Sequence, residues 1–496
     1  MSNFFKKDIG IILLLTVLFF AILPFFYMHQ GLFSIDTGRE FYIPQQMLKG
    51  EILYRDIFNI YGAFSYQLNA ILFKIFGVEF KTLYCAGILN SLGIIITLYL
   101  LAREFLAKNI SALFSITIMF SLVFTTFLYN SNVPYTYSIA YALSSFLLSI
   151  LFLIKYIKSE NSKMAYLACL FAGISLSNKY EFTLYPLILI YVFGFLKPLG
   201  IKKGLKALLS FLIIPIISFG TLFLNFNEIK ETINLTQNLI NAPILKTFFE
   251  KFGVFFNIKG IINLIISNPI YALFGFIPII NLSLFVIFFK KIYENKTLFI
   301  FILCAICASA KTFFFLNISH MGAFILPICL LATITFIKPK QILTIFLIFC
   351  SLIFASENFN SLEYRKFELN NIYTYQKDGE QLKIGVDYIL ENSLETDKVI
   401  VLPEGSYINF LTNRKGDNFY YNLSPLFYYD VFGEERVLKH FQNNLPEFFI
   451  ILPINNIEYG KRFFGTDYAQ DFYEMIINNY NLVKEENNVK IFRKKI

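Results

Sequence analysis

The feature that most constrains this 496-residue chain is a series of apolar blocks, each about 20 residues long, separated by short lysine-bearing connections. A helix of that length crosses about 30 Å of hydrocarbon, and it must be a helix because lipid offers no partner to a bare backbone amide. Only 16% of the residues are charged, whereas soluble domains carry about a quarter. The sequence therefore predicts a polytopic α-helical membrane protein.

About eleven transmembrane helices are expected from the lengths of these blocks. Their approximate ranges are 8–28, 83–102, 110–128, 135–154, 165–177, 182–196, 207–225, 260–289, 297–315, 321–337 and 341–355. The block 260–289 contains Pro269 and Pro278, so it suits either one broken helix or a surface helix followed by a span. No small-x-small cleavage site follows the first block, which we interpret as a retained helix.

The basic residues divide the short connections into two alternating sets. One set is rich in lysine and comprises 103–108, 155–163, 197–206, 290–296 and 338–340. The other set, 129–134, 178–181 and 316–320, contains only Lys179. Because basic connections stay in the cytoplasm, we expect a multi-pass protein of the cell (inner) membrane with a cytoplasmic N-terminus. An odd number of spans then places the C-terminal part outside, together with two longer outer loops, 29–82 and 226–258.

The chain is predicted to contain two units, a transmembrane domain over 1–356 and an extracytoplasmic soluble domain over 357–496. In the second unit, strand-like runs at 398–403, 448–453 and 489–494 alternate with helical patterns at 380–393, 434–444 and 470–480. This alternation is typical of a small α/β domain.

Composition excludes several classes of site. The chain contains no G-x-G-x-x-G or P-loop sequence, so we predict no nucleotide site. Cys304 and Cys307 form a C-x-x-C without a second ligand pair, so we predict no metal site there. The net charge of +9 is explained by connection lysines, and we predict no nucleic-acid partner.

The outer loop 29–82 is far longer than a connection between two helices requires, and it has its own amphipathic patterning and a cluster of charges. Asp36 follows the first span closely and could act as a general base toward an acceptor hydroxyl or amine. Arg39 and Arg55 could hold a phosphate in bidentate fashion. The alternatives are ordinary solvated charges, or a helix cap formed by Asp36 and Thr37.

The order of motifs in this loop carries a family resemblance. The loop reads D-x-G-R-E at 36–40, G-E-x-L-Y-R-D at 50–56 and N-x-Y-G at 59–62. It resembles the first outer loop of GT-C membrane glycosyltransferases, above all the bacterial protein-mannosyltransferase-like group of family 39, which includes the aminoarabinose transferases of lipid A. The resemblance implies that Asp36 is the catalytic acid-base residue, that the donor is a polyprenyl-phosphate sugar, and that helices of the loop lie on the membrane surface.

The chain departs from the family pattern at two points. Ala63 stands where relatives usually have Pro, and the nearest second acidic residue is Glu40, so one or two catalytic carboxylates remain possible. The resemblance extends to 177–187 and to 310–327, which add four candidate donor-binding residues. Together with Arg39, Glu40 and Arg55, the predicted donor site then includes Lys179, Glu181, Lys311 and His320.

Each added residue also has a structural interpretation. Lys179 and Glu181 could pair with each other, because charges this deep in an apolar region are costly unless paired or functional. Lys311 could extend its ammonium group to the interface, and His320 could be a polar interfacial residue.

The predicted function is transfer of a sugar, with inversion, from a polyprenyl-phosphate donor to a glycan, lipid or protein acceptor, in contact with membrane lipids. No cofactor is predicted beyond the lipid-linked donor, and a divalent metal requirement stays open. A polysaccharide polymerase is an alternative, although loop 226–258 lacks the arginines expected of one. A lipid-linked sugar flippase or transporter would favour paired halves, which the sequence does not show. An oligosaccharyltransferase is expected to need a Trp-Trp-Asp sequence, and the chain has no Trp.

Overall fold

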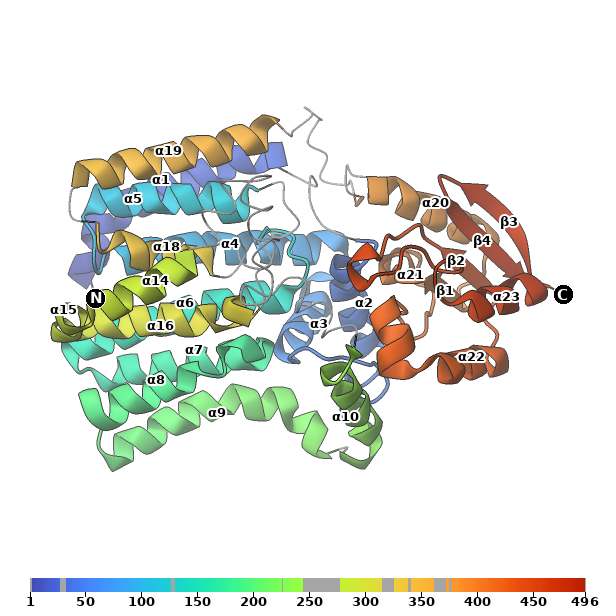
Figure 1. Ribbon diagram of the computed structural model, residues 1–496, viewed down its shortest axis with the longest axis horizontal. Helices are drawn as coiled ribbons and strands as arrows, with labels where there is room; N and C mark the ends of the chain where they lie inside the picture. Colours follow the sequence, from blue (N-terminus) through green and yellow to red (C-terminus); the bar gives the residue numbers. More distant parts are fainter. Residues whose placement is uncertain are drawn as a thin grey trace.

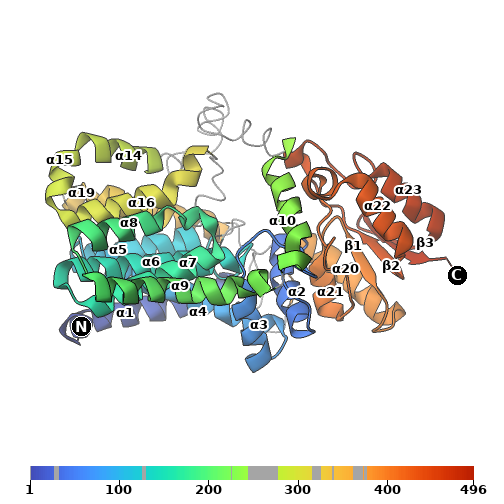
Figure 2. The same ribbon diagram turned by 90° about the horizontal axis from the view of Figure 1, so that it is seen from below.

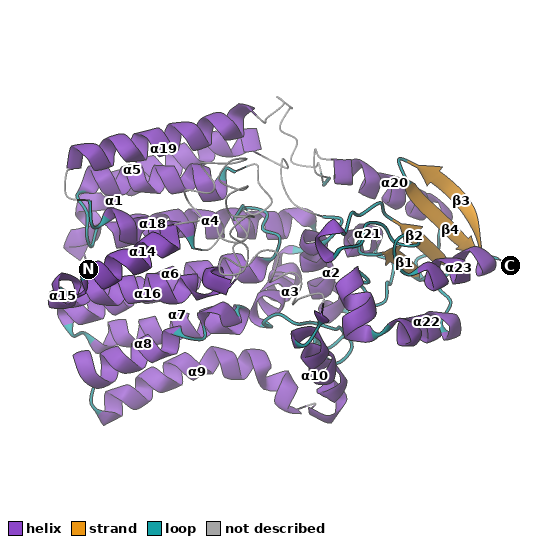
Figure 3. Cartoon of the chain, in the orientation of Figure 1, coloured by secondary structure: helices purple, strands orange, loops and turns teal. Residues whose placement is uncertain are grey.

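The computed structural model places a bundle of long helices at one end of the molecule and a β-sheet at the other (Figures 1 and 3). It describes residues 2–26, 33–125, 130–224, 226–243, 277–314, 325–337, 340–360, 372–373 and 377–495. Within these described residues, four helices are long and apolar enough to cross a membrane, namely Asp8–Phe26, Phe80–Ala102, Tyr137–Ser159 and Ile201–Gly220. The chain is thus an integral membrane protein by the length and composition of its helices.

Each of the eleven predicted ranges overlaps a helix of the bundle. These helices are α1 (Ser2–Ile22), α4 (Phe80–Ala102), α5 (Lys108–Ile118), α6 (Tyr137–Ser159), α7 (Ser162–Asn178), α8 (Tyr185–Tyr191), α9 (Ile201–Leu224), α14 (Ile277–Ile287), α16 (Lys296–Phe314), α18 (Leu326–Ile334) and α19 (Lys340–Asn360). Shorter helical segments are η1 (Leu23–Phe26), η2 (Met119–Val123), η3 (Tyr180–Phe182), η4 (Val192–Leu196), α15 (Phe289–Glu294), η5 (Leu426–Phe432) and η6 (Ile457–Tyr459). The exact number of membrane crossings stays a prediction, since several of these helices are shorter than a full span.

The basic connections gather at the end of the bundle that lies away from the sheet (Figure 1). Ion pairs tie these connections together there: Asp8–Arg103, Glu104–Lys158 and Glu160–Lys197. Consecutive bundle helices run in opposite directions. Every second connection along the chain therefore lies at the same end of the bundle. This grouping agrees with the charge asymmetry of the sequence, while the orientation of the termini stays a prediction.

Three helices of the two longer loops lie between the bundle and the sheet (Figures 1 and 2). They are α2 (Asp36–Leu48), α3 (Phe64–Phe76) and α10 (Phe226–Ile240). The described part of loop 29–82 thus contains the helices α2 and α3. Their position on the membrane surface stays a prediction.

The C-terminal part folds around a four-stranded mixed sheet, ordered β1-β2-β4-β3. Its elements are α20 (Lys377–Asn392), β1 (Val399–Leu402), α21 (Ser406–Thr412), α22 (Glu434–Asn443), β2 (Phe448–Ile451), α23 (Gln470–Asn479), β3 (Tyr480–Glu486) and β4 (Val489–Lys494). β1 and β2 pair in parallel, whereas β4 pairs antiparallel with β2 and β3. The predicted strands at 398–403, 448–453 and 489–494 and the three predicted helices are confirmed.

Alternate residues of β1 and β2 face opposite sides of the sheet, as the two-residue repeat of a strand requires. Val399 and Val401 belong to a core cluster with α20 and α21, whereas Ile400 and Leu402 belong to a cluster with α22 and α23. Both faces are covered by helices, which explains why β1 reads as a continuous apolar run rather than an alternating one.

The C-terminal unit shares its core with the bundle rather than standing apart from it. Tyr407 and Phe410 of α21 pack against Phe41 of α2, with ring centroids 5.5 and 5.3 Å from that ring. Tyr42 of α2 donates a hydrogen bond to Asn418 Oδ1 at 2.6 Å. The segment that begins the outer loop is thus held directly by the C-terminal unit.

Candidate functional site

The first turn of α2 carries the carboxylate that the sequence singled out. Arg39 Nη2 donates to Asp36 Oδ1 at 2.8 Å across one helical turn; the Asp36 side chain is 30% exposed and the Arg39 side chain 5%. The N-cap residue is Ile35, which makes no side-chain capping hydrogen bond, and Asp36 is the first helical residue. Asp36 is therefore oriented by Arg39 and remains reachable by solvent.

Glu40, one turn further along α2, is completely buried. Its Oε1 accepts a hydrogen bond from the Tyr66 hydroxyl at 2.9 Å, and its Oε2 accepts one from the Tyr137 backbone N–H at 2.9 Å. Burial raises the pKa of this carboxyl above its ordinary value, although the Arg39 charge and these hydrogen bonds act in the opposite direction. Both oxygens are engaged by protein donors, so Glu40 fastens α2 to α3 and to the start of α6.

Two cationic side chains, Arg39 and Lys179, lie against the Tyr61 ring, next to the first turn of α2. The Arg39 guanidinium carbon lies 4.9 Å from the ring centroid, and Lys179 Nζ lies 4.2 Å from it. Both cationic side chains are buried. Arg39 Nε is a buried donor with no hydrogen-bond partner among the described residues. A buried arginine and lysine on one aromatic ring can offer several hydrogen-bond donors to an anion, above all to a phosphate.

Gly62 explains why Tyr61 can meet Lys179. Its N–H donates to the Asn178 carbonyl at 3.3 Å, so the loop touches the end of α7 directly before Lys179. A Cβ at position 62 would lie 2.1 Å from the Ser177 carbonyl oxygen, which leaves no room for a side chain. The glycine of the N-x-Y-G motif therefore permits the close approach that brings Tyr61 to the lysine.

We expect Gly62→Ala to lower the rate of the sugar transfer predicted from the sequence by about 10–100-fold, because a displacement of about 1 Å near reacting groups costs that much. The added methyl group must push the Tyr61 loop away from α7, at about 1–3 kcal/mol of folding free energy. Initial rates and the thermal unfolding midpoint measure the two effects. Gly93→Ala is the matched control, since a Cβ at Gly93 meets no atom within 4 Å. A Gly62→Ala protein as active as the Gly93→Ala protein would show that the close approach is dispensable.

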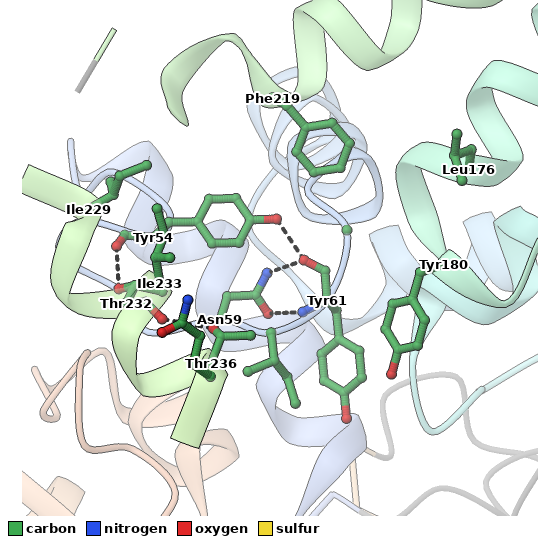
Figure 4. Close-up of a pocket in the computed structure, with 13 residues that line it drawn as sticks. Tyr54, Asn59, Tyr61, Leu176, Tyr180, Phe219, Ile229, Thr232, Ile233 and Thr236 are labelled. Atoms are coloured by element: carbon green, nitrogen blue, oxygen red, sulfur yellow. Dashed lines mark hydrogen bonds between the residues drawn. The ribbon is translucent and has the colours of Figure 1, made fainter. Parts of the chain in front are cut away.

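A cavity of about 340 Å³ opens on the side of the Tyr61 loop that faces α9 and α10 (Figure 4). Apolar and aromatic side chains dominate its wall, among them Leu176, Phe219, Ile229, Ile233 and Tyr180. The polar groups of the wall are largely used internally: the Tyr54 hydroxyl donates to the Tyr61 carbonyl at 2.6 Å, and the Thr232 hydroxyl donates to the Tyr54 carbonyl at 2.6 Å. The cavity thus suits an apolar chain whose polar end reaches Tyr61.

For the other four residues predicted to bind the donor, no contact with Asp36, Arg39 or Tyr61 is described. Arg55 forms a two-point ion pair with its neighbour Asp56, at 2.9 and 2.7 Å, in the turn before Tyr61. Glu181 lies in η3, two residues after Lys179. Lys311 lies on α16, but its side chain is outside what the structure describes, as is the whole of His320.

Sequence reasoning missed the residues that organise the cluster. Tyr61, Tyr66 and Tyr137 were given no role, although the N-x-Y-G motif already pointed to the segment of Tyr61. In the described ranges, no three His, Cys, Asp or Glu side chains are grouped so that they could hold a metal ion. The divalent metal requirement therefore stays open.

Comparisons with known proteins give a family match for part of the chain and a similar fold for nearly all of it. Residues 64–220 match the family model described as dolichyl-phosphate-mannose-protein mannosyltransferase. The fold is similar to that of ArnT from Cupriavidus metallidurans bound to undecaprenyl phosphate, at 12% identity and a TM-score of 0.54, over 96% of this chain and 97% of that chain. The same protein in the apo state gives 12% identity and a TM-score of 0.53, over 98% of each chain.

An oligosaccharyltransferase from Archaeoglobus fulgidus, in complex with Zn and sulfate, gives 12% identity and a TM-score of 0.50, over 88% of this chain and 67% of that chain. A search of curated proteins finds no match. At these identities the structural likeness concerns the fold. Residues 64–220 thus resemble the dolichyl-phosphate-mannose-protein mannosyltransferase family, and the chain as a whole is similar in fold to ArnT.

Proposed function

We propose that the protein transfers a sugar, with inversion, from a polyprenyl-phosphate carrier to an acceptor on the outer face of the membrane. The observation that carries this proposal is the convergence of one accessible carboxylate, Asp36, with two buried cations, Arg39 and Lys179, around Tyr61. The ArnT structure with a similar fold holds undecaprenyl phosphate, which supports a lipid phosphate as the donor.

The proposed reaction needs one base and one anion site. Asp36 takes the proton of an acceptor hydroxyl or amine while the acceptor atom bonds to the anomeric carbon of the sugar. The bond between that carbon and the phosphate oxygen breaks, and polyprenyl phosphate leaves with the electron pair. Arg39 and Lys179 stabilise the negative charge that develops on the leaving phosphate. A single displacement at the anomeric carbon inverts its configuration.

The cavity beside Tyr61 supports the lipid part of this proposal. Its apolar wall can cover the first isoprene units of the carrier, with the phosphate held at Arg39 and Lys179. Arg39 can serve Asp36 and the phosphate at once, because a guanidinium group has five N–H donors. Glu40 acts as a positioning residue in this proposal, since protein donors engage both of its oxygens.

The proposed orientation has the N-terminus in the cytoplasm and the C-terminal unit outside. A reporter enzyme that is active only outside the cytoplasm is expected to work when fused after residue 495 and to fail when inserted beside Lys203, in the basic first turn of α9. The opposite pattern of reporter activity would reverse the assignment of inside and outside.

Release of polyprenyl phosphate tests the function itself. The purified protein in liposomes is expected to release polyprenyl phosphate from at least one member of a panel of polyprenyl-phosphate sugars, and Asp36→Asn protein provides the blank. Movement of intact lipid-linked sugar across the bilayer without release would favour a flippase. Successive addition of many sugar units to one acceptor would favour a polymerase.

A further inference from the structure

The Tyr42 hydroxyl joins α2 to the C-terminal unit at two points. Tyr42 lies on the helix that begins with Asp36, and its side chain is almost fully buried. The hydroxyl donates a hydrogen bond to Asn418 Oδ1 at 2.6 Å and accepts one from the Gly416 N–H at 3.0 Å. Both partners belong to one buried segment, so loss of the hydroxyl would leave a buried acceptor and a buried donor unpaired.

The face of α2 that carries Tyr42 contacts the C-terminal unit along the whole helix. Four residues spaced four, three and four positions apart form this face: Gly38, Tyr42, Gln45 and Lys49. A Cβ on Gly38 would lie 2.7 Å from Tyr407 Cβ, so only a glycine lets α21 come this close. The Gln45 side-chain amide donates to the Phe410 carbonyl at 3.3 Å, and Lys49 Nζ donates to Asn413 Oδ1 at 2.8 Å.

Asp36 belongs to a different face of α2, which it shares with Glu40, Ile43 and Met47. Tyr66 of α3 donates to Glu40, and Ile43 and Met47 pack in the same buried cluster as Tyr66. The helix is thus held between α3 on one face and α21 on another. A rotation of about 10° moves a side-chain end, about 5–6 Å from the helix axis, by about 1 Å. Such a displacement near reacting groups costs up to about 10²-fold in rate.

Asp417, between the two partners of Tyr42 in the sequence, fixes the segment 416–420. One of its carboxylate oxygens accepts hydrogen bonds from the Phe419 and Tyr420 N–H groups, at 3.1 and 2.9 Å. The other oxygen lies 3.0 Å from Lys398 Nζ and 2.8 Å from His440 Nε2. These contacts connect the segment to the residue before β1 and to α22. The segment that binds the α2 hydroxyl is therefore itself fixed to the sheet and to a helix that covers it.

We propose that Tyr42 is a positioning residue that, through Gly416 and Asn418, sets the rotation of α2 and thereby aims the Asp36 carboxylate at the acceptor. The inference rests on the proposed function, in which Asp36 is the base. The C-terminal unit then contributes to the rate without touching the substrate, because its segment 416–420 determines the position of the helix that carries the base. The contacts of Gln45 and Lys49 keep α2 seated when the hydroxyl is lost, but its rotation is then less closely defined.

Tyr42→Phe keeps the ring and removes the hydroxyl, and we expect it to lower kcat by about 10–100-fold. In an Asp36→Asn background the same change should alter the residual single-turnover rate by less than about 2-fold, because residues that act through one group are not additive. Tyr480→Phe is the matched control: Tyr480 is buried at the start of β3, at the far edge of the sheet from α2 (Figure 1), and donates to the Pro446 carbonyl at 2.7 Å. This control should lower the thermal unfolding midpoint about as much as Tyr42→Phe and leave kcat within about 2-fold of wild type.

Hydrogen–deuterium exchange tests the position of α2 without requiring turnover. In the full chain in detergent, Tyr42→Phe should speed exchange of the α2 amides by about 5–10-fold, the equivalent of one lost hydrogen bond, and leave α4 unchanged. Tyr480→Phe should leave α2 exchange like that of wild type. Unchanged α2 exchange in Tyr42→Phe protein, or an equal loss of rate in the wild-type and Asp36→Asn backgrounds, would overturn the assignment. Failure of the proposed function looks different: α2 exchange responds to Tyr42→Phe as expected, but wild type consumes no polyprenyl-phosphate sugar.

Discussion

Replacing Asp36 with Asn should reduce kcat for sugar transfer by about 10²–10⁴-fold, the contribution typical of a positioned general base. The amide keeps the shape of the carboxylate but cannot take up the acceptor proton. The KM for the donor should change little, because Arg39 and Lys179, the cations proposed to bind its phosphate, remain on the Tyr61 ring. Steady-state rates over a range of donor concentrations separate the two parameters.

Asp56→Asn is the control for this experiment. Asp56 lies on the same outer loop, forms an ion pair with Arg55 and accepts a hydrogen bond from the Ile52 N–H at 2.8 Å. Its replacement should leave kcat within about 3-fold of wild type, since it lies in a separate turn with its own partners. A purely structural role for Asp36, as the partner of Arg39, predicts an active Asp36→Asn protein, because the amide oxygen of Asn can still accept a hydrogen bond from Arg39. Full activity would therefore end the catalytic assignment of Asp36.

Lys179→Met should raise the KM for the donor by about 10–150-fold, the equivalent of one lost hydrogen bond to a charged group. The protein should remain folded, because methionine fills a similar space and removes a buried charge whose desolvation is costly. Donor titrations in the transfer assay give KM, and the thermal unfolding midpoint reports on folding.

Lys74→Met provides the comparison for Lys179→Met. Lys74 is an exposed residue in the last turn of α3, in the same outer loop, and its loss should leave the donor KM unchanged. If Lys179→Met gives a normal KM with a lowered unfolding midpoint, the lysine serves only to hold Tyr61 and α7 together.

The main architecture was predictable because lipid imposes one length and one pattern on every span. Apolar blocks located the bundle helices, and continuous apolar runs located β1 and β2, which are buried on both faces. β3 was missed because four of its seven residues are polar or charged and most are exposed. Such an edge strand is held by pairing with β4, which a local pattern cannot reveal.

The sequence predicted individual residues of the candidate site but not how they are arranged in space. The outer-loop motif supplied Asp36, Arg39 and Glu40, and the charged break before α8 supplied Lys179. Their convergence on Tyr61 could not be read from the sequence, because it depends on a glycine approaching the end of a distant helix. The different roles proposed for Asp36 and Glu40 also rest on tertiary contacts, because these carboxylates lie one turn apart on α2 but only Glu40 is buried.

The hydrogen bond between Tyr42 and Asn418 joins residues 376 positions apart. During synthesis at about 5–20 residues per second, the partner of α2 emerges roughly 20–75 s after α2 itself. Throughout that interval the helix that carries Asp36 is already outside the ribosome but lacks its contacts with the C-terminal unit. A chain interrupted before the C-terminal unit would insert most of its helices but leave α2 without its contacts to that unit. Such a prematurely terminated product is expected to sit in the membrane without carrying out the proposed transfer.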